Sequence, residues 1–302
     1  MGAGPGRRWG APAAAVRGPR RGAPIEPIEP APLALVDVSQ PPALENVLLG
    51  VRERVATVTL NRPEQRNPLS AGMLGDLHAA LAWCRYEPDV RVVVLTGAGD
   101  RAFCAGADLG SFDADAPELR RHHDRHRFVD LFLLLQDLGK PVVGRINGHA
   151  LAGGFGLACA CDLLVAVESA TFGTPEINVG VWPAMIQAVL ARNLPRKVLL
   201  EMELLGERWT AARLHEIGLV NRVAATLDEL DAVAAELAGR LAAKSPAVLR
   251  IGRDSFYRQQ DMEFRAALEY LQAQLTLVTL SEDAKEGVSA FFQKRQPEFR
   301  GR

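Results

Sequence analysis

Short apolar runs alternate with helix-like stretches along the first half of this sequence, and the alternation constrains the fold more than any other feature. Runs rich in Val, Ile and Leu are typical of strands, and the stretches between them carry apolar residues at helical spacing. From about Thr210 onward the pattern is almost entirely helical. Strands alternating with helices, followed by helices alone, predict an α/β fold with a helical C-terminal subdomain. The expected strands are 47–51, 55–60, 90–96, 141–146 and 163–167, and the expected helices between them are 70–86, 117–138 and 153–161.

Two segments rich in glycine and alanine, Ala102–Leu109 and Asn147–Leu157, each follow an expected strand. Small residues leave backbone N–H groups unshielded, and a helix N-terminus directs free N–H groups at one point. Taken singly, each segment favours the simpler interpretation of a tight turn with close packing. Facing each other, they would supply the two donors of an oxyanion hole. Neither matches a phosphate-binding P-loop or a dinucleotide-binding turn.

Further motifs occur with these two segments in a fixed order. They are Val55–Pro63, Ala105–Leu109, Lys140–Val143, Asn147-Gly148, Cys161-Asp162, Phe172–Ile177, Val179–Pro183, Ala284–Phe291 and Lys294–Pro297. With them the sequence resembles the crotonase, or enoyl-CoA hydratase/isomerase, superfamily over all but its N-terminal zone. The resemblance implies a spiral of β-β-α units over residues 44–207, which holds an acyl-CoA site. It also implies a helical subdomain over residues 208–302, which covers the site and forms subunit contacts.

The resemblance implies a site that binds acyl-CoA thioesters and stabilises a thioester enolate between two backbone N–H groups. By motif position these donors are Ala107 and Gly153. Each fixed donor stabilises such an oxyanion by about 3 kcal/mol. Gly110 stands where many relatives carry a lysine, so the anchoring of coenzyme A must rely on residues such as Arg66 or Lys294. The other expected substrate contacts are Ala105, Asp108, Leu109, Gly154, Trp182 and Phe291.

The carboxylates decide which reaction the resemblance implies. Family hydratases typically use two glutamates, and here Gly156 occupies the first position and Glu176 the second. An unpaired carboxyl group beside an apolar pocket has a raised pKa, as a general acid or base requires, whereas a structural ion pair is the alternative for Glu176. We expect addition of water to an enoyl-CoA thioester. A Δ3,Δ2-enoyl-CoA isomerase that uses Glu176 alone and a non-catalytic acyl-CoA-binding protein are the alternatives. Asp113 and Asp115 are candidate substitutes for the missing carboxylate, although a solvated surface acid is the simpler interpretation of both.

Composition and charge exclude other classes of function. The net charge is -1 and aromatic residues make up 6% of the chain, so no nucleic-acid partner is expected. No apolar run is long enough to span a membrane. The four cysteines do not form a disulfide framework, and His122 and His126 share a helix face without further ligands, so we expect no metal site.

The resemblance also sets expectations for cofactors and partners. Coenzyme A is part of the acyl-CoA substrate, and no other cofactor is expected. The family forms trimers or dimers of trimers, and Phe291 and Lys294 match positions that reach a neighbour's coenzyme A.

Residues 1–43 form a separate compositional zone. They hold nine of the 19 prolines, and residues 1–25 carry five arginines and no acid. Such a segment cannot bury enough apolar surface to order itself, so we expect a disordered extension. An acid-poor, arginine-rich start also describes a mitochondrial transit peptide, but prolines interrupt any amphipathic helix here. We therefore expect a cytoplasmic enzyme of the bacterial type, or a mitochondrial-matrix enzyme if the extension is a transit peptide.

Overall fold

A large sheet forms the base of the fold in the computed structural model, which describes residues 40–108 and 117–302 and, at Arg121, the backbone alone. Within these residues its strands lie in the order β1-β2-β3-β5-β7-β10. β1 and β2 form an antiparallel hairpin, and the following strands are parallel. Every residue of β3 is buried, which explains its unbroken apolar run. The strands are β1 Val47–Arg52, β2 Val55–Leu60, β3 Val92–Gly97, β5 Val142–Ile146, β7 Leu163–Val167 and β10 Arg222–Ala224.

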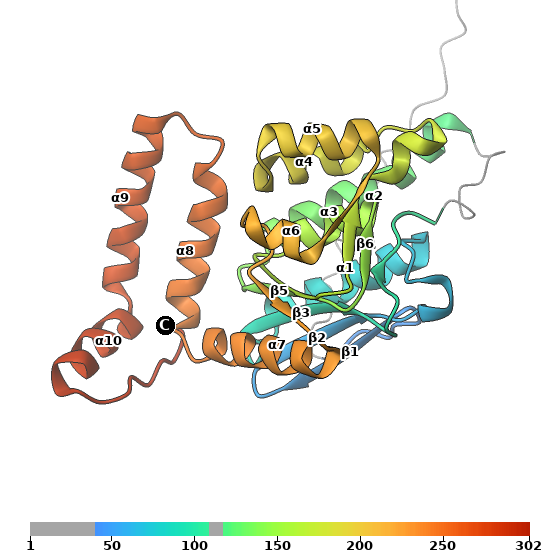
Figure 1. The fold of residues 1–302 in the computed structure, drawn as a ribbon. Helices are drawn as coiled ribbons and strands as arrows, with labels where there is room; N and C mark the ends of the chain where they lie inside the picture. Colours follow the sequence, from blue (N-terminus) through green and yellow to red (C-terminus); the bar gives the residue numbers. More distant parts are fainter. Residues whose placement is uncertain (1–39, 109–116) are drawn as a thin grey trace, which may run out of the picture. The chain divides into compact units, whose positions relative to one another are not determined.

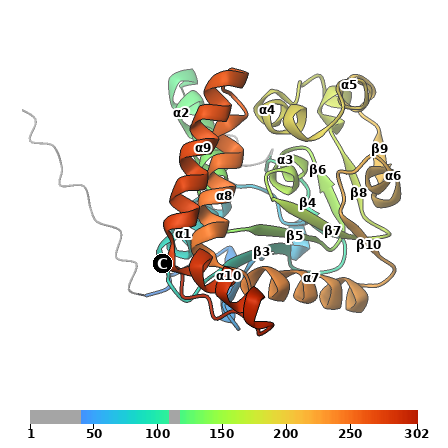
Figure 2. The ribbon, with the colours of Figure 1, turned by 90° about the vertical axis from the view of Figure 1, so that its left-hand side faces the viewer.

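Helices cover both sides of this sheet. α1 (Ala71–Tyr86) corresponds to the expected helix over residues 70–86. The Ser70 Oγ caps it by accepting a hydrogen bond from the Met73 N–H at 3.2 Å. α7 (Leu227–Ala242) lies on one side of the sheet, and α3 (Gly153–Cys159) lies on the other (Figure 2). The other helices between β3 and β10 are α2 Glu118–Gln136, α4 Ala184–Asn193, α5 Arg196–Leu205 and α6 Ala211–Glu216.

A second, small sheet has the order β4-β6-β8-β9. β4, β6 and β8 are parallel, and β9 is antiparallel to β8. On three occasions the chain passes from the large sheet to the small sheet and then into a helix or helical turn, which gives the expected spiral of β-β-α units. The sequence does not predict these strands, because three residues are too few to show a period. The elements are β4 Ala102–Cys104, β6 His149–Leu151, β8 Thr171–Gly173, β9 Arg208–Thr210 and the 3-10 turn η3 Pro175–Val179.

Two buried asparagines stabilise the loop that leads from β3 of the large sheet to β4. The Asn147 Oδ1 accepts a hydrogen bond from the Gly97 N–H at 3.1 Å, and its Nδ2 donates to the Gly99 carbonyl at 2.8 Å. The Asn67 Nδ2 donates to the Ala102 carbonyl at 2.9 Å. These bonds satisfy buried backbone groups that no sheet pairs, and they fix where the loop after β4 starts.

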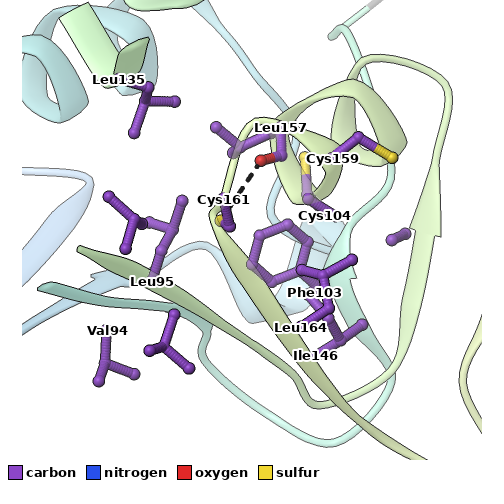
Figure 3. Close-up of a cluster of buried hydrophobic side chains, with 14 of the residues drawn as sticks. Val94, Leu95, Phe103, Cys104, Leu135, Ile146, Leu157, Cys159, Cys161 and Leu164 are labelled. Carbon is purple, nitrogen blue, oxygen red and sulfur yellow. Dashed lines mark hydrogen bonds between the residues drawn. The ribbon is translucent and has the colours of Figure 1, made fainter. Parts of the chain in front are cut away.

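Apolar side chains fill the space between the two sheets and α3 (Figure 3). Phe103 from β4 and Leu157 from α3 belong to this cluster, together with Ile146 and Leu164 from the large sheet. This core makes the small sheet rigid, although its strands are short. The cysteines are buried and free, as expected: Cys84, Cys104, Cys159 and Cys161.

After β10 the chain is helical, as the sequence predicts. α8 and α9 pair with each other, and α10 packs against both. Figure 1 shows α9 and α10 set apart from the two sheets. Within the described ranges, no helix is long and apolar enough to cross a membrane. The helices are α8 Pro246–Gln259, α9 Phe264–Leu280 and α10 Glu282–Gln293.

Candidate active site

Three loops converge at one edge of the small sheet. Because β4, β6 and β8 are parallel, their carboxyl ends meet at the same edge, where parallel sheets commonly bind ligands. Ala107 lies just past the end of β4, Gly153 follows β6, and Glu176 follows β8. The fold therefore brings the three predicted catalytic residues to one edge.

The backbone N–H groups of Ala107 and Gly153 lie close together. A Cβ built on Gly153 would lie 3.6 Å from the Ala107 nitrogen. A β-bridge joins Leu69 to Ala107 through two hydrogen bonds: the Leu69 N–H donates to the Gly106 carbonyl at 2.8 Å, and the Asp108 N–H donates to the Leu69 carbonyl at 3.4 Å. Neither bond uses the Ala107 N–H. Gly153 is the first residue of α3, where N–H groups have no acceptor within the helix. Neither N–H donates to a group in the described part of the chain, and a ligand oxygen can accept from both.

The backbone around these donors is strained and closely packed. Ala152, just before α3, has φ 52° and ψ -129°, a conformation that costs an L-residue on the order of 1–3 kcal/mol. Its N–H donates to the Gly173 carbonyl at 2.9 Å, which ties this loop to the end of β8. A Cβ on Gly106 (φ +101°) would approach the Ala152 Cβ to 2.6 Å, and a Cβ on Gly154 would approach the Cys104 carbonyl to 2.3 Å. The small residues of both segments are therefore required by this packing.

A hollow of about 470 Å³ lies next to the Ala107 donor. The exposed Arg66 contributes a positive charge to the lining of this hollow, beside the acidic side chains of Glu64 and Asp108. The Arg62 guanidinium lies 3.9 Å from the Asp108 carboxylate. Leu109 and Gly110 lie outside the described residues. The hollow brings together four of the expected coenzyme A contacts, Arg66, Ala105, Ala107 and Asp108, with Glu64, Gln65 and Pro68.

Glu176 presents a half-buried carboxyl group from η3. Its Oε2 is buried and has no hydrogen-bond partner in the described part of the chain. Burial raises the pKa of this carboxyl group and outweighs a hydrogen bond from the backbone N–H of Glu176, which lowers the pKa; the nearby carboxylate of Glu203 also raises it. Among the described residues no basic side chain pairs with Glu176, so the ion-pair alternative lacks a partner here.

Glu203 on α5 is a buried residue of this region that the sequence analysis missed. Its exposed fraction is 0%. Its Oε2 accepts a hydrogen bond from the Gln187 Nε2 at 3.4 Å, and the Gln187 Oε1 accepts one from the Trp182 indole N–H at 3.4 Å. The signal was present in the sequence, because Leu199, Met202 and Glu203 share one face of α5 at helical spacing. A lone acid on an otherwise apolar helix face marks a candidate functional group.

Gly156, the position of the missing carboxylate, faces a filled space. A Cβ built there would lie 2.3 Å from the Ile186 Cγ2 and 3.3 Å from the Phe132 Cζ. Ile186 on α4 is 2% exposed, so it cannot turn into solvent. This part of the site has no room for the glutamate that family hydratases carry.

Phe291 and Lys294 are not gathered at this edge. Both lie at the end of α10 and are exposed, and Figure 1 shows α10 well apart from α3 and β6. They therefore do not reach the Ala107 donor within one chain.

The described residues contain no group of three or more His, Cys, Asp and Glu side chains that could hold a metal ion. His122 and His126 lie exposed on α2, and the His126 Nε2 lies 3.5 Å from the Asp130 carboxylate. Asp113 and Asp115, the candidate substitute carboxylates, lie outside the described residues.

Comparisons with known proteins identify the family of this chain. The family model for enoyl-CoA hydratase/isomerase matches residues 50–302. The 2,3-dehydroadipyl-CoA hydratase of Escherichia coli (strain K12) is 35% identical over 260 residues, which cover 86% of this chain and 100% of that protein. A putative enoyl-CoA hydratase of Thermus thermophilus is 37% identical over 247 residues, 81% of this chain and 97% of that one. A crystal structure of an enoyl-CoA hydratase from Mycobacterium smegmatis matches with a TM-score of 0.81 and 36% identity, over 84% of this chain and 99% of that one. This chain therefore belongs to the enoyl-CoA hydratase/isomerase family.

Proposed function

We propose that this protein adds water across the double bond of an enoyl-CoA thioester. One observation carries the proposal. The N–H groups of Ala107 and Gly153 and the buried Oε2 of Glu176 have no hydrogen-bond partner within the described residues, and all three follow strands that end at the same sheet edge. The similarity to proteins named as hydratases supports the same reaction.

The chemistry follows from the charges that the reaction creates. Bonding at Cβ turns the thioester into an enolate, and its carbonyl oxygen becomes negative. The two N–H groups would stabilise that oxygen by about 3 kcal/mol each. A carboxyl group with a raised pKa holds a proton more readily near neutral pH, so Glu176 could deliver a proton to Cα.

A second candidate, Δ3,Δ2-enoyl-CoA isomerisation, is favoured by Gly156. Ile186 and Phe132 close the place of a first glutamate, and isomerisation needs only one group that takes a proton from one carbon and returns it to another. A non-catalytic acyl-CoA-binding protein is the remaining alternative. In that case the buried Oε2 of Glu176, which accepts no hydrogen bond from the described residues, would have no role in a reaction.

Two substrates distinguish these functions. We expect the ultraviolet absorbance of the conjugated enoyl thioester to fall when crotonyl-CoA is added to the enzyme, because hydration removes the double bond. A rise with trans-3-hexenoyl-CoA and no change with crotonyl-CoA would identify an isomerase. No change with either substrate, together with binding of the thioester by calorimetry, would identify a binding protein.

We further infer a trimer or a dimer of trimers. Phe291 and Lys294 lie apart from Ala107 within one chain, so any contact of theirs with coenzyme A requires a neighbouring subunit. Sedimentation equilibrium tests this assembly, and a monomer would contradict it. The reaction requires no cofactor beyond the coenzyme A of the substrate. The buried free cysteines suit a reducing compartment, such as the cytoplasm or a mitochondrial matrix.

A further inference from the structure

We propose that Glu203 is the second carboxyl group of this active site and that Glu203 and Glu176 together hold the water molecule that adds to the substrate. The inference rests on the proposed hydratase function and names the group that replaces the carboxylate missing at Gly156.

Two hydrogen bonds join the end of α5 to the segment that carries Glu176. The Thr174 hydroxyl donates to the Met202 carbonyl at 3.1 Å, and the Asn178 Nδ2 donates to the Gly206 carbonyl at 3.4 Å. These two bonds flank Glu203 along α5 and flank Glu176 along η3. We call the two segments that these bonds join, residues 174–178 and 202–206, the clamped unit, and it carries both carboxyl groups.

Both carboxyl groups carry an oxygen without a partner. The Oε1 of Glu203 and the Oε2 of Glu176 are buried, and neither accepts a hydrogen bond in the described part of the chain. A buried acceptor left unpaired costs about 1–3 kcal/mol. One water molecule that donates a hydrogen to each oxygen would satisfy both acceptors at once.

Other charged groups of the neighbouring helices do not neutralise this pair. On α4, Arg192 pairs with Asp261 at 2.9 Å, and on α5, Glu201 lies 3.9 Å from Arg213. Of the ionisable groups in the described ranges, Glu203 is the one whose charge shifts the pKa of Glu176. The polar partner of Glu203 is the uncharged Gln187.

Repulsion between two neighbouring carboxylates favours a state in which the pair holds one proton. Such a pair supplies both groups that hydration requires. The water oxygen bonds to Cβ while one water proton passes to the ionised carboxylate, and the protonated carboxyl group gives its proton to Cα. The thioester gains the elements of one water molecule, and the pair again holds one proton.

The rate of proton exchange at Cα can be measured separately from hydration, because exchange does not require a water molecule at Cβ. Exchange of the α-protons of butyryl-CoA for deuterium requires the two N–H donors and one base. A residue that holds the adding water affects hydration and leaves this exchange in place, whereas a residue that merely supports the fold affects both.

The test compares Glu203→Gln with the matched control Glu201→Gln, an exposed acid on the same helix. We expect Glu203→Gln to lower the turnover of crotonyl-CoA by about 100-fold or more. The rate of α-proton exchange in butyryl-CoA should change by less than about 3-fold, far less than the turnover. Glu201→Gln should retain both activities. Circular dichroism and a melting curve establish that each variant is folded, and Glu203→Met serves if the glutamine variant does not fold.

Each outcome has one meaning. Wild-type rates of hydration in Glu203→Gln would overturn the role of Glu203 and leave the hydratase function standing. Parallel losses of hydration and exchange would make Glu203 a structural residue. A wild-type enzyme that exchanges α-protons without hydrating crotonyl-CoA would overturn the hydratase function, and the water-holding pair with it.

Discussion

Two regions of this protein contain partly or fully buried carboxyl groups that differ in their hydrogen bonding. Before β7, the Asp162 carboxylate accepts hydrogen bonds from the Val142 N–H (2.7 Å), the Arg253 Nε (2.8 Å) and the Tyr257 hydroxyl (2.6 Å). At the edge of the small sheet, Glu176 and Glu203 each have a buried oxygen that accepts no hydrogen bond from residues 40–108 and 117–302. The difference separates a carboxyl group that holds the fold together from a pair that remains available for chemistry.

The pKa directions follow the same division. For Asp283 at the start of α10, burial pushes the pKa upward, but hydrogen bonds from the Ser245 hydroxyl and from backbone N–H groups outweigh burial and lower it. For Glu176 and Glu203, burial dominates and the pKa is raised. The direction of the pKa shift therefore depends on the number of hydrogen bonds donated to the carboxyl group as well as on its burial.

The largest expected effect concerns Glu176. Glu176→Gln should lower kcat for the hydration of crotonyl-CoA by about 10²–10⁴-fold, the usual contribution of a general acid or base. Binding of the thioester should persist, because the N–H donors are unchanged. Stopped-flow absorbance and calorimetry measure the two quantities, and retention of more than a tenth of the activity would contradict the role of Glu176.

Asp162→Asn should destabilise the fold without changing the chemistry. It removes the charge partner of Arg253, whose side chain is 7% exposed, and breaking such a buried pair costs about 3–5 kcal/mol. Denaturant unfolding measures the loss, and kcat per folded molecule should be that of the wild type. If the free energy of unfolding of Asp162→Asn stayed within about 1 kcal/mol of the wild-type value, well below the cost of breaking a buried ion pair, the contrast with Glu176 would be lost.

Gly156→Ala should destabilise the protein by about 1–3 kcal/mol, because it overpacks the contact with Ile186. Gly75→Ala in α1 is the matched control. A Cβ there has nothing within 4 Å, so that change should stabilise the helix by about 0.5–1 kcal/mol.

Adding Ile186→Ala to Gly156→Ala should cost less than the sum of the two single changes, since it removes the clashing methyl group. Additive losses in the double-mutant cycle would show that the space beside Gly156 is not closed by Ile186.

The smallest effect is a gain. A carboxyl group whose pKa is raised in the folded state contributes full stability below its ordinary pKa and loses that contribution as the pH rises through the raised value. Glu203→Gln removes this penalty, so it should stabilise the protein at pH 8 by about 0.5–2 kcal/mol and have little effect at pH 4. Thermal melts at both pH values measure the gain. A loss of stability at pH 8 would mean that Glu203 is satisfied by a partner.

Sequence reasoning predicted the long strands, the helix over residues 70–86 and the positions of Ala107, Gly153 and Glu176 after their strands. It did not predict the small sheet, because each of its strands is three residues long and is stabilised by contacts distant in sequence. It named Asp113 and Asp115 as candidate substitutes for the missing carboxylate, with a solvated surface acid as the simpler interpretation, and both lie outside the described residues. It did not single out Glu203, which comes from a helix that follows η3 and lies in the clamped unit with Glu176.

The most direct test of this account measures turnover of crotonyl-CoA and the free energy of unfolding side by side for Glu176→Gln and Asp162→Asn. The account predicts that Glu176→Gln loses turnover and keeps its stability, while Asp162→Asn loses stability and keeps its turnover per folded molecule. If both variants lost both properties, or if Glu176→Gln turned over crotonyl-CoA at the wild-type rate, the division between structural and chemical carboxyl groups would be wrong.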